Sequence, residues 1–119
     1  MTSWNDDVQK ELLWGREALS IGNHGKARTC ARRAVGKASA ELCRHDSTLD
    51  YGADMMSRIR GIAGDERFPE TVRAAAERLQ SRISADFTSL SVDPIRDAEI
   101  VLSDIAQRIG SAQARSSDR

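Results

Sequence analysis

The sequence predicts an all-α protein, an up-and-down bundle of about five helices. Apolar residues recur at intervals of three and four along every periodic segment, and no stretch shows sustained alternation of apolar and polar residues. Residues that start or stop helices separate these segments. The connections are short, which favours antiparallel neighbours, and no repeat of fixed period indicates a solenoid.

Length and composition set further limits. A chain of 119 residues is long enough to fold as one domain without disulfides or metals, and we expect that domain over residues 1–110. The hydrophobic share is 39%, with only two Trp, two Phe and one Tyr, so the core must be aliphatic and rich in alanine. Lys plus Arg and Asp plus Glu both total 18. A neutral chain has no global field that attracts nucleic acid or membranes.

The first helix is expected over about residues 4–21. Ser3 and Asp6 have the spacing of a capping box, and Val8, Leu12 and Leu19 share one face. The four residues that follow, Gly-Asn-His-Gly at 22–25, form a turn in which two glycines can adopt positive φ.

The second helix is expected from about residue 25 to 45, and its packing face consists almost wholly of small residues. These residues share an arc of about 100°; they are Ala27, Ala31, Ala34, Val35, Ala38 and Leu42. Small side chains let neighbouring backbones approach closely. We therefore expect this helix to be the central element of the bundle.

A third helix is expected to follow at once, because Asp46, Ser47 and Thr48 all offer N-cap oxygens. Its apolar residues step by three and four; they are Leu49, Ala53, Met56, Ile59 and Ala63. With Met55 and Ile62 this helix is apolar on two sides, which fits core packing or an adaptable partner-binding groove.

The last two helices each begin at a proline. Pro69 is expected at the first position of the fourth helix. Val72, Ala76, Leu79 and Ile83 line that helix, and Phe87 extends the face. In the fifth, Asp93 is the expected N-cap and Pro94 the first helical residue, before Ile95, Ala98, Leu102, Ile105 and Ile109. Gly110 is expected to stop this helix and to leave 111–119 as a disordered tail.

Cysteine usage indicates a reduced compartment. Cys30 and Cys43 fall on the second helix, about 20 Å apart along its axis, which excludes a disulfide between them. With no signal peptide and no long apolar run, we expect a cytoplasmic protein. Cys43 and His45 are ligand types, but residues two apart on a helix point in nearly opposite directions. We predict no metal site, no cofactor and no catalytic residue.

The candidate binding site is a basic stripe on the second helix. The stripe consists of Lys26, Arg33, Lys37 and Arg44, which lie within an arc of about 40°. A row of cations can follow a phosphate backbone. The alternative is a solvated face neutralised by the chain's own carboxylates. No aromatic residue interleaves with the stripe to stack on bases.

The order of these features resembles the HEPN family of small helical bundles. The matching stretches are the end of the first helix with the Ala-rich second helix, the polar connection after it, the segment from Phe68 to Leu79, and the final helix; by number they are 17–38, 44–46, 68–79 and 97–109. Ribonuclease members carry an Arg followed, after four to six intervening residues, by a His. Here Arg16 stands too far before His24, and Arg44 is adjacent to His45. The resemblance therefore implies the fold without the family's RNA-cleaving motif.

The resemblance implies a non-catalytic binding or interaction module, acting as a homodimer or beside a nucleotidyltransferase-type partner. An exposed Trp4 or Trp14 would suit a dimer seam. One alternative is an enzyme that acts on nucleotides or RNA through Arg33, Lys37, Arg44 and His45. Another is a structural adaptor without a small ligand.

Overall fold

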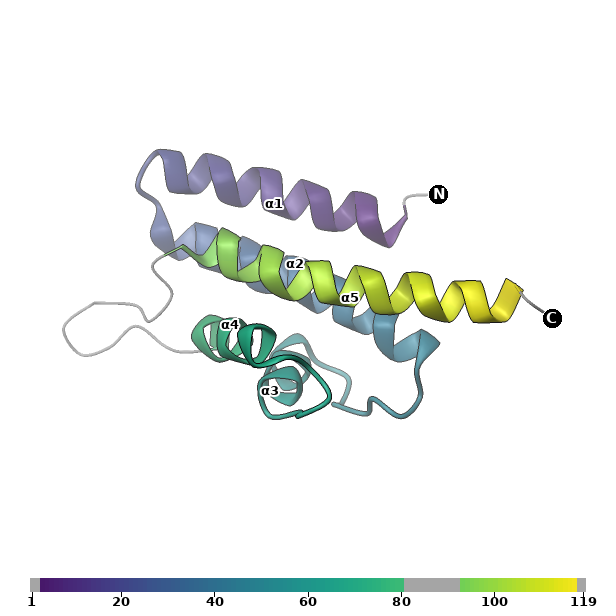
Figure 1. Ribbon diagram of the computed structural model, residues 1–119. Helices are drawn as coiled ribbons and strands as arrows, with labels where there is room; N and C mark the ends of the chain where they lie inside the picture. Colours follow the sequence, from purple (N-terminus) through teal and green to yellow (C-terminus); the bar gives the residue numbers. More distant parts are fainter. Residues whose placement is uncertain (1–2, 81–92, 118–119) are drawn as a thin grey trace.

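The computed structural model describes residues 3–80 and 93–117, with side chains described through residue 114. These residues form five α-helices and no strand, which confirms the predicted all-α bundle (Figure 1). In chain order the helices are α1 (Trp4–Ser20), α2 (His24–His45), α3 (Met55–Ala63), α4 (Glu70–Gln80) and α5 (Pro94–Ser117).

Helix α2 is the central element, as its small-residue face predicts. It contacts all four other helices. The residues of its packing face are 0–1% exposed. Helix α1 lies antiparallel on one side of α2, and α3 and α4 pack together on the opposite side (Figure 1). Helix α5 packs on α2 and α4 but barely touches α1. Most of α1 therefore depends on α2 alone for its packing.

Among the described residues the core is aliphatic, with one buried aromatic ring, that of Phe68. Its largest fully buried members besides Phe68 are Leu42, Ile59, Ile62, Leu79, Ile105, Ile109, Val8, Val35 and Val101. The alanines of α2 and α4 fill the narrow space between these side chains, since Ala31, Ala34, Ala75 and Ala76 are all 0% exposed.

A tight turn joins α1 to α2. The N–H of Gly22 donates to the carbonyl of Leu19 and the N–H of Asn23 to that of Ala18, a Schellman motif with Gly22 at φ 79°. The Asn23 side chain then caps α2 by accepting from the N–H of Lys26 at 3.1 Å. Gly22 is the glycine that needs positive φ here, because Gly25 already belongs to α2.

The third helix begins later than predicted. The Oδ1 atom of Asp46 accepts hydrogen bonds from both the N–H and the hydroxyl of Thr48. The polar connection therefore forms a local turn instead of a helix cap. Gly52, at φ 94°, bends the chain again, and Asp54 is the actual N-cap of α3. Leu49 is buried all the same, but it enters the core from this loop.

The two proline starts differ in detail. Asp93 caps α5 by accepting from the N–H of Arg96, and Pro94 is the first helical residue, both as predicted. Pro69 instead precedes α4, and its carbonyl accepts from the N–H groups of Val72 and Arg73. The expected contributions of Ile83 and Phe87 lie outside the described residues.

The fifth helix does not stop at Gly110. It continues to Ser117, so the prediction of a disordered tail is wrong for residues 111–117. Gly110 is exposed and does not have positive φ, and Ala112 beyond it is 8% exposed, which gives the added turn a small buried face. The end of α5 projects beyond the other helices (Figure 1). Within the described residues, no helix is both long and apolar enough to span a membrane.

Candidate functional site

The predicted basic stripe lies on the surface, but half of it is already paired. Arg44 donates to the Glu41 carboxylate at 2.9 Å, and the Lys37 ammonium lies 3.5 Å from the Glu11 carboxylate of α1. Lys26 and Arg33 are exposed and form no ion pair with any described residue. The chain's own carboxylates therefore neutralise two of the four cations.

Glu11 occupies an unusual position between α1 and α2. Its side chain is 3% exposed against 44% for Lys37, so this ion pair joins a buried anion to a half-exposed cation. Its second oxygen, Oε1, has no hydrogen-bond partner among the described residues. Burial, with a smaller effect from Glu11, raises the pKa of the neighbouring Cys30 thiol. Burial at 2% exposure and the raised pKa both disfavour the reactive thiolate form of Cys30.

Several other arginines form hydrogen bonds or ion pairs that link elements of the bundle. Arg58 of α3 donates to the Ser39 hydroxyl and to the Gly36 carbonyl of α2, both at 3.1 Å. Arg78 of α4 pairs with Asp97 of α5 at 2.8 Å. Arg32, Arg73 and Arg108 donate to backbone carbonyls of Leu79, Phe68 and Arg67. These arginines join helices and loops to one another. Fewer cationic side chains therefore remain to bind an external anion.

A polar cluster ties the two connections that flank α3. The Tyr51 hydroxyl donates to Asp65, and Arg67 donates to both Asp65 and Thr48. Hydrogen bonds from Arg67 and Tyr51 hold the pKa of Asp65 well below its ordinary value. Burial and the same carboxylate raise the pKa of the Tyr51 phenol. The cluster is a closed structural network, with its donors and acceptors facing one another.

His45 and Cys43 both lie near the end of α2. The Nε2 atom of His45 lies 3.1 Å from the Glu41 carboxylate, on the same helix turn as Arg44. Burial is the main cause of the raised pKa of the Cys43 thiol. Among the described side chains, no three of the types His, Cys, Asp or Glu are grouped so that they can hold a metal ion.

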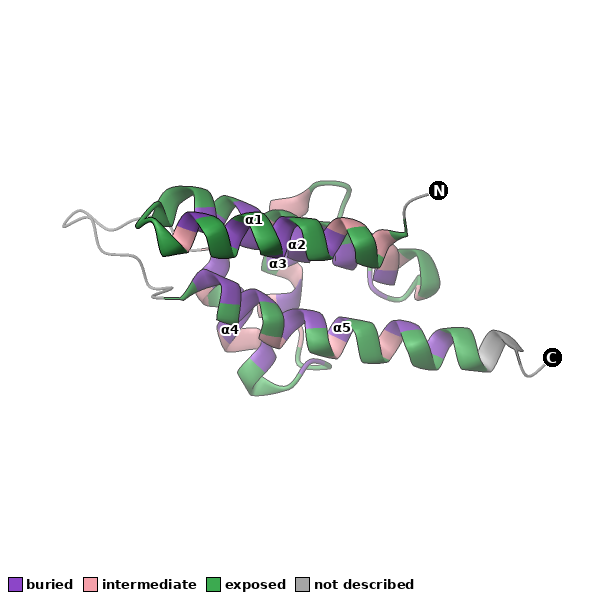
Figure 2. Cartoon of the chain, turned by 90° about the horizontal axis from the view of Figure 1, so that it is seen from above, coloured by how far each residue is buried: buried purple, intermediate pink, exposed green. Residues whose placement is uncertain are grey.

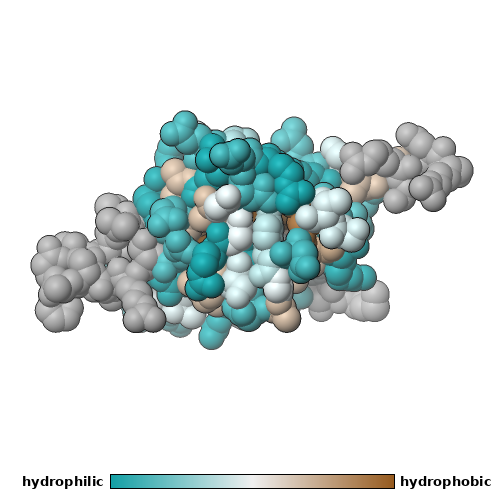
Figure 3. Space-filling view, turned by 90° about the horizontal axis from the view of Figure 1, so that it is seen from below, coloured by the Kyte–Doolittle hydropathy of each residue, from teal (hydrophilic) through white to brown (hydrophobic). Residues whose placement is uncertain are grey.

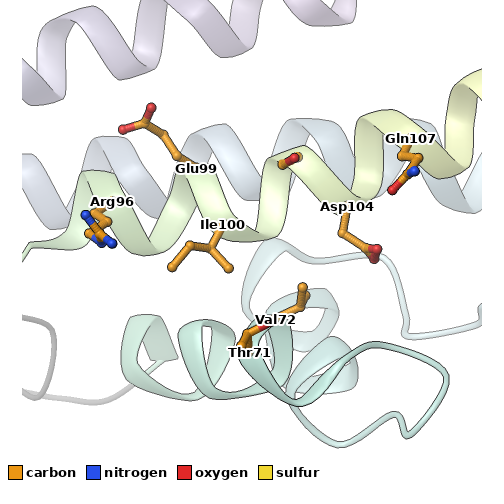
Figure 4. Close-up of a pocket in the computed structure, with 8 residues that line it drawn as sticks. Thr71, Val72, Arg96, Glu99, Ile100, Asp104 and Gln107 are labelled. Atoms are coloured by element: carbon orange, nitrogen blue, oxygen red, sulfur yellow. The ribbon is translucent and has the colours of Figure 1, made fainter.

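A shallow hollow of about 530 Å³ lies between α4 and α5. Ile100 and Asp104 of α5 point toward α4, where Thr71 and Val72 line the other wall (Figure 4). Glu99 points the other way and pairs with Arg16 of α1 at 3.5 Å. Asp104 pairs with Arg108 at 2.8 Å, so Arg96 is the one charged lining residue without an ion-pair partner among the described residues.

The outer face of α1, defined here by Lys10, Leu13, Trp14, Glu17 and the C-cap residue Ile21, exposes large apolar side chains. Leu13, Trp14 and Ile21 are 53%, 47% and 80% exposed, and they are the exposed large hydrophobic residues of the described chain. At about 100° per residue, Leu13 lies nearly opposite the side of α1 that packs on the core, while Trp14 and Ile21 lie on the flank between that point and the buried Ala18. Exposed positions follow the length of α1 in Figure 2.

The opposite side of the molecule differs. Seen from below, over α3 and α4, the surface is largely hydrophilic with small pale and brown areas between polar side chains (Figure 3). Met55 and Met56 of α3 are only partly exposed and pack against the core, with Met55 over Gly36. Core packing therefore accounts for the two apolar sides of α3.

Sequence reasoning found part of the outer face of α1. It named Trp14 and Trp4 as dimer-seam residues, but Trp4 is half-buried against the core. It missed Leu13 and Ile21. The sequence signal for the exposure of Leu13 and Ile21 is their angular position on the helix, which lies away from the line of Val8, Leu12 and Leu19.

Comparison with known proteins finds no relative of this chain. No family model, no curated protein and no solved structure matches this chain. The HEPN resemblance stays a prediction.

Proposed function

We propose that this chain is a non-catalytic helical bundle that acts as a protein-interaction module through the outer face of α1. One observation carries the proposal: the large apolar side chains that are exposed among the described residues, Leu13, Trp14 and Ile21, all lie on that face. Tryptophan is enriched at the centre of protein interfaces, where it buries a large area at low cost in side-chain entropy.

The setting we propose is the reduced cytoplasm, where the free thiols Cys30 and Cys43 persist. The HEPN resemblance favours a second copy or a nucleotidyltransferase-type protein as the partner. Both are proteins, and both fit an apolar helix face better than a nucleic acid does.

The alternative, a nucleotide- or RNA-acting enzyme that uses the basic stripe, has less support. Lys37 and Arg44 already have carboxylate partners, so a phosphate ligand would have to compete with Glu11 and Glu41. Within the stripe, only Lys26 and Arg33 have no ion-pair partner among the described residues. Two cations about 10 Å apart along a helix give weak, salt-sensitive attraction.

Site-specific cross-linking tests the proposal. A photoreactive residue is placed at Trp14 in one variant and at Arg60, an exposed position on α3, in a control variant. We expect cross-links to a defined protein, or to the chain itself, from position 14 and not from position 60. Excess unlabelled wild type should suppress them, and excess Trp14→Ser should not. Equal cross-linking from both positions would contradict the proposal.

A further inference from the structure

Two charged residues on the outer face of α1, Lys10 and Glu17, have no ion-pair partner among the described residues. Lys10 and Glu17 lie on one line of the helix, seven residues and about 10.5 Å apart, too far to pair with each other. Neither forms an ion pair with any described residue, although Asp6 lies one turn before Lys10. Each thus presents an unmatched charge beside the exposed apolar side chains.

We infer that the partner of this face is a second copy of the chain, bound antiparallel about a two-fold axis that passes between positions 13 and 14 of α1. This inference rests on the proposed function. Lys10 and Glu17 lie equally far from that point in opposite directions. A two-fold rotation therefore sets Lys10 against the partner's Glu17, and symmetry forms the same pair a second time.

The apolar residues fit the same axis. Leu13 and Trp14 stand at the centre of the contact, where the two copies approach most closely, and Ile21 stands at each end, where the rotation sets it against the partner's Asp6. A hollow of about 340 Å³, lined by Asp6, Gln9, Lys10 and Leu13, adjoins the centre and gives room for apolar side chains of the second copy. Burial of Trp and Leu supplies the attraction, and the charges select the orientation.

Orientation is selected because the parallel alternative is repulsive. In a parallel pair in register, Lys10 meets the partner's Lys10 and Glu17 meets the partner's Glu17. The antiparallel pair turns both contacts into attractions.

The size of the contact predicts a weak dimer. Helix α1 has 17 residues, and at 1.5 Å per residue it is only about 26 Å long. A single helix pair of that length buries less than the roughly 1,200 Å² of a stable standard interface. We expect a monomer–dimer equilibrium that depends on concentration in the micromolar range or above.

Sedimentation equilibrium with charge-reversal variants tests the inference. Lys10→Glu gives a chain with two acids on the face, and Glu17→Lys gives one with two bases. Each alone should raise the dimer dissociation constant about tenfold or more, because both symmetric attractions become repulsions. An equimolar mixture should associate again, since each variant supplies the charge that the other lacks. The double variant Lys10→Glu/Glu17→Lys should dimerise like the wild type.

Two further variants complete the design. Trp14→Ala should raise the dissociation constant at least about thirtyfold, because it removes the central anchor from both copies. Lys26→Glu, a charge reversal on α2, is the matched control and should leave the dimer unchanged. Thermal unfolding of each variant verifies that the bundle itself is intact.

Three outcomes would overturn the inference: a wild type that stays monomeric at millimolar concentration, a dimer that the single reversals do not weaken, or a mixture that associates no better than its components. The cross-linking experiment separates these from failure of the proposed function. If position 14 cross-links to a different protein, the proposal of an interaction module holds and the second copy is excluded as the partner. If no cross-link forms at all, both proposals are contradicted.

Discussion

The polar connections around α3 and the outer face of α1 differ in how their side chains are partnered. Around α3, Tyr51, Asp65, Arg67 and Thr48 bond to one another, and Arg58 reaches back to α2. On α1, Trp14 is 47% exposed, and it lies beside cationic and anionic residues that have no described ion-pair partner. The comparison teaches that charge density alone does not mark a functional surface. What matters is whether the polar and charged side chains already have hydrogen-bond or ion-pair partners within the molecule.

The largest effect is expected at Asp65, in the closed network. Asp65→Ala removes acceptors from Tyr51 and Arg67 and should lower the free energy of unfolding at pH 7 by about 2–3 kcal/mol. The folded-state pKa of Asp65 is depressed, so the wild type holds this stability above the unfolded pKa and loses it as pH falls. Urea unfolding should therefore show the difference between the two proteins shrinking below about pH 4.

The neighbouring carboxylate provides the control. Glu66 is exposed, and Glu66→Ala should change stability by less than about 0.5 kcal/mol at either pH. Equal losses at Asp65 and Glu66 would mean that the network around α3 contributes nothing beyond general surface charge.

A smaller effect on the free energy of unfolding is expected within the basic stripe. It should differ between the residues that have a carboxylate partner and those that do not. Lys37→Ala leaves the buried Glu11 carboxylate without its cation and should cost about 1–2 kcal/mol. Arg33→Ala, one turn earlier and exposed, should cost less than about 0.5 kcal/mol. Chemical denaturation of both variants checks this. Identical stabilities would show that the Glu11 contact is as weak as an ordinary surface pair.

The smallest effect is expected at Gly110, on the projecting end of α5. No atom lies within 4 Å of a Cβ built at this position, and its φ is not positive. Gly110→Ala should therefore raise stability by about 0.5–1 kcal/mol through helix propensity. If α5 ended at Gly110 in a left-handed cap, the same change would destabilise, as we expect for Gly22→Ala at φ 79°. Thermal melts of the two variants distinguish these cases.

The sequence predicted the helices well where periodicity and caps agree. Ser3 and Asp93 cap their helices as predicted, and the alanines of α2 form the buried centre. It failed where a local hydrogen bond competes with a cap, as at Asp46, and where an exposed glycine is tolerated, as at Gly110.

The candidate site was harder to predict for a different reason. The cations of the stripe are visible in the sequence, but their partners are not, because Glu11 meets Lys37 only through the packing of α1 on α2. The exposure of Leu13 and Ile21 likewise depends on which side of α1 faces α2. Pairing and exposure are tertiary properties, which a single sequence states only indirectly.

The central claim is that the outer face of α1, and not the basic stripe of α2, is the interaction surface. Its most direct test is sedimentation equilibrium of two triple variants at matched concentrations, with folding verified by circular dichroism. The outer-face variant Leu13→Ser/Trp14→Ser/Ile21→Ser should remain folded and monomeric, because these side chains add little to the core. The stripe variant Lys26→Gln/Arg33→Gln/Arg44→Gln should associate like the wild type. Loss of association in the stripe variant, with the outer-face variant unaffected, would contradict the account.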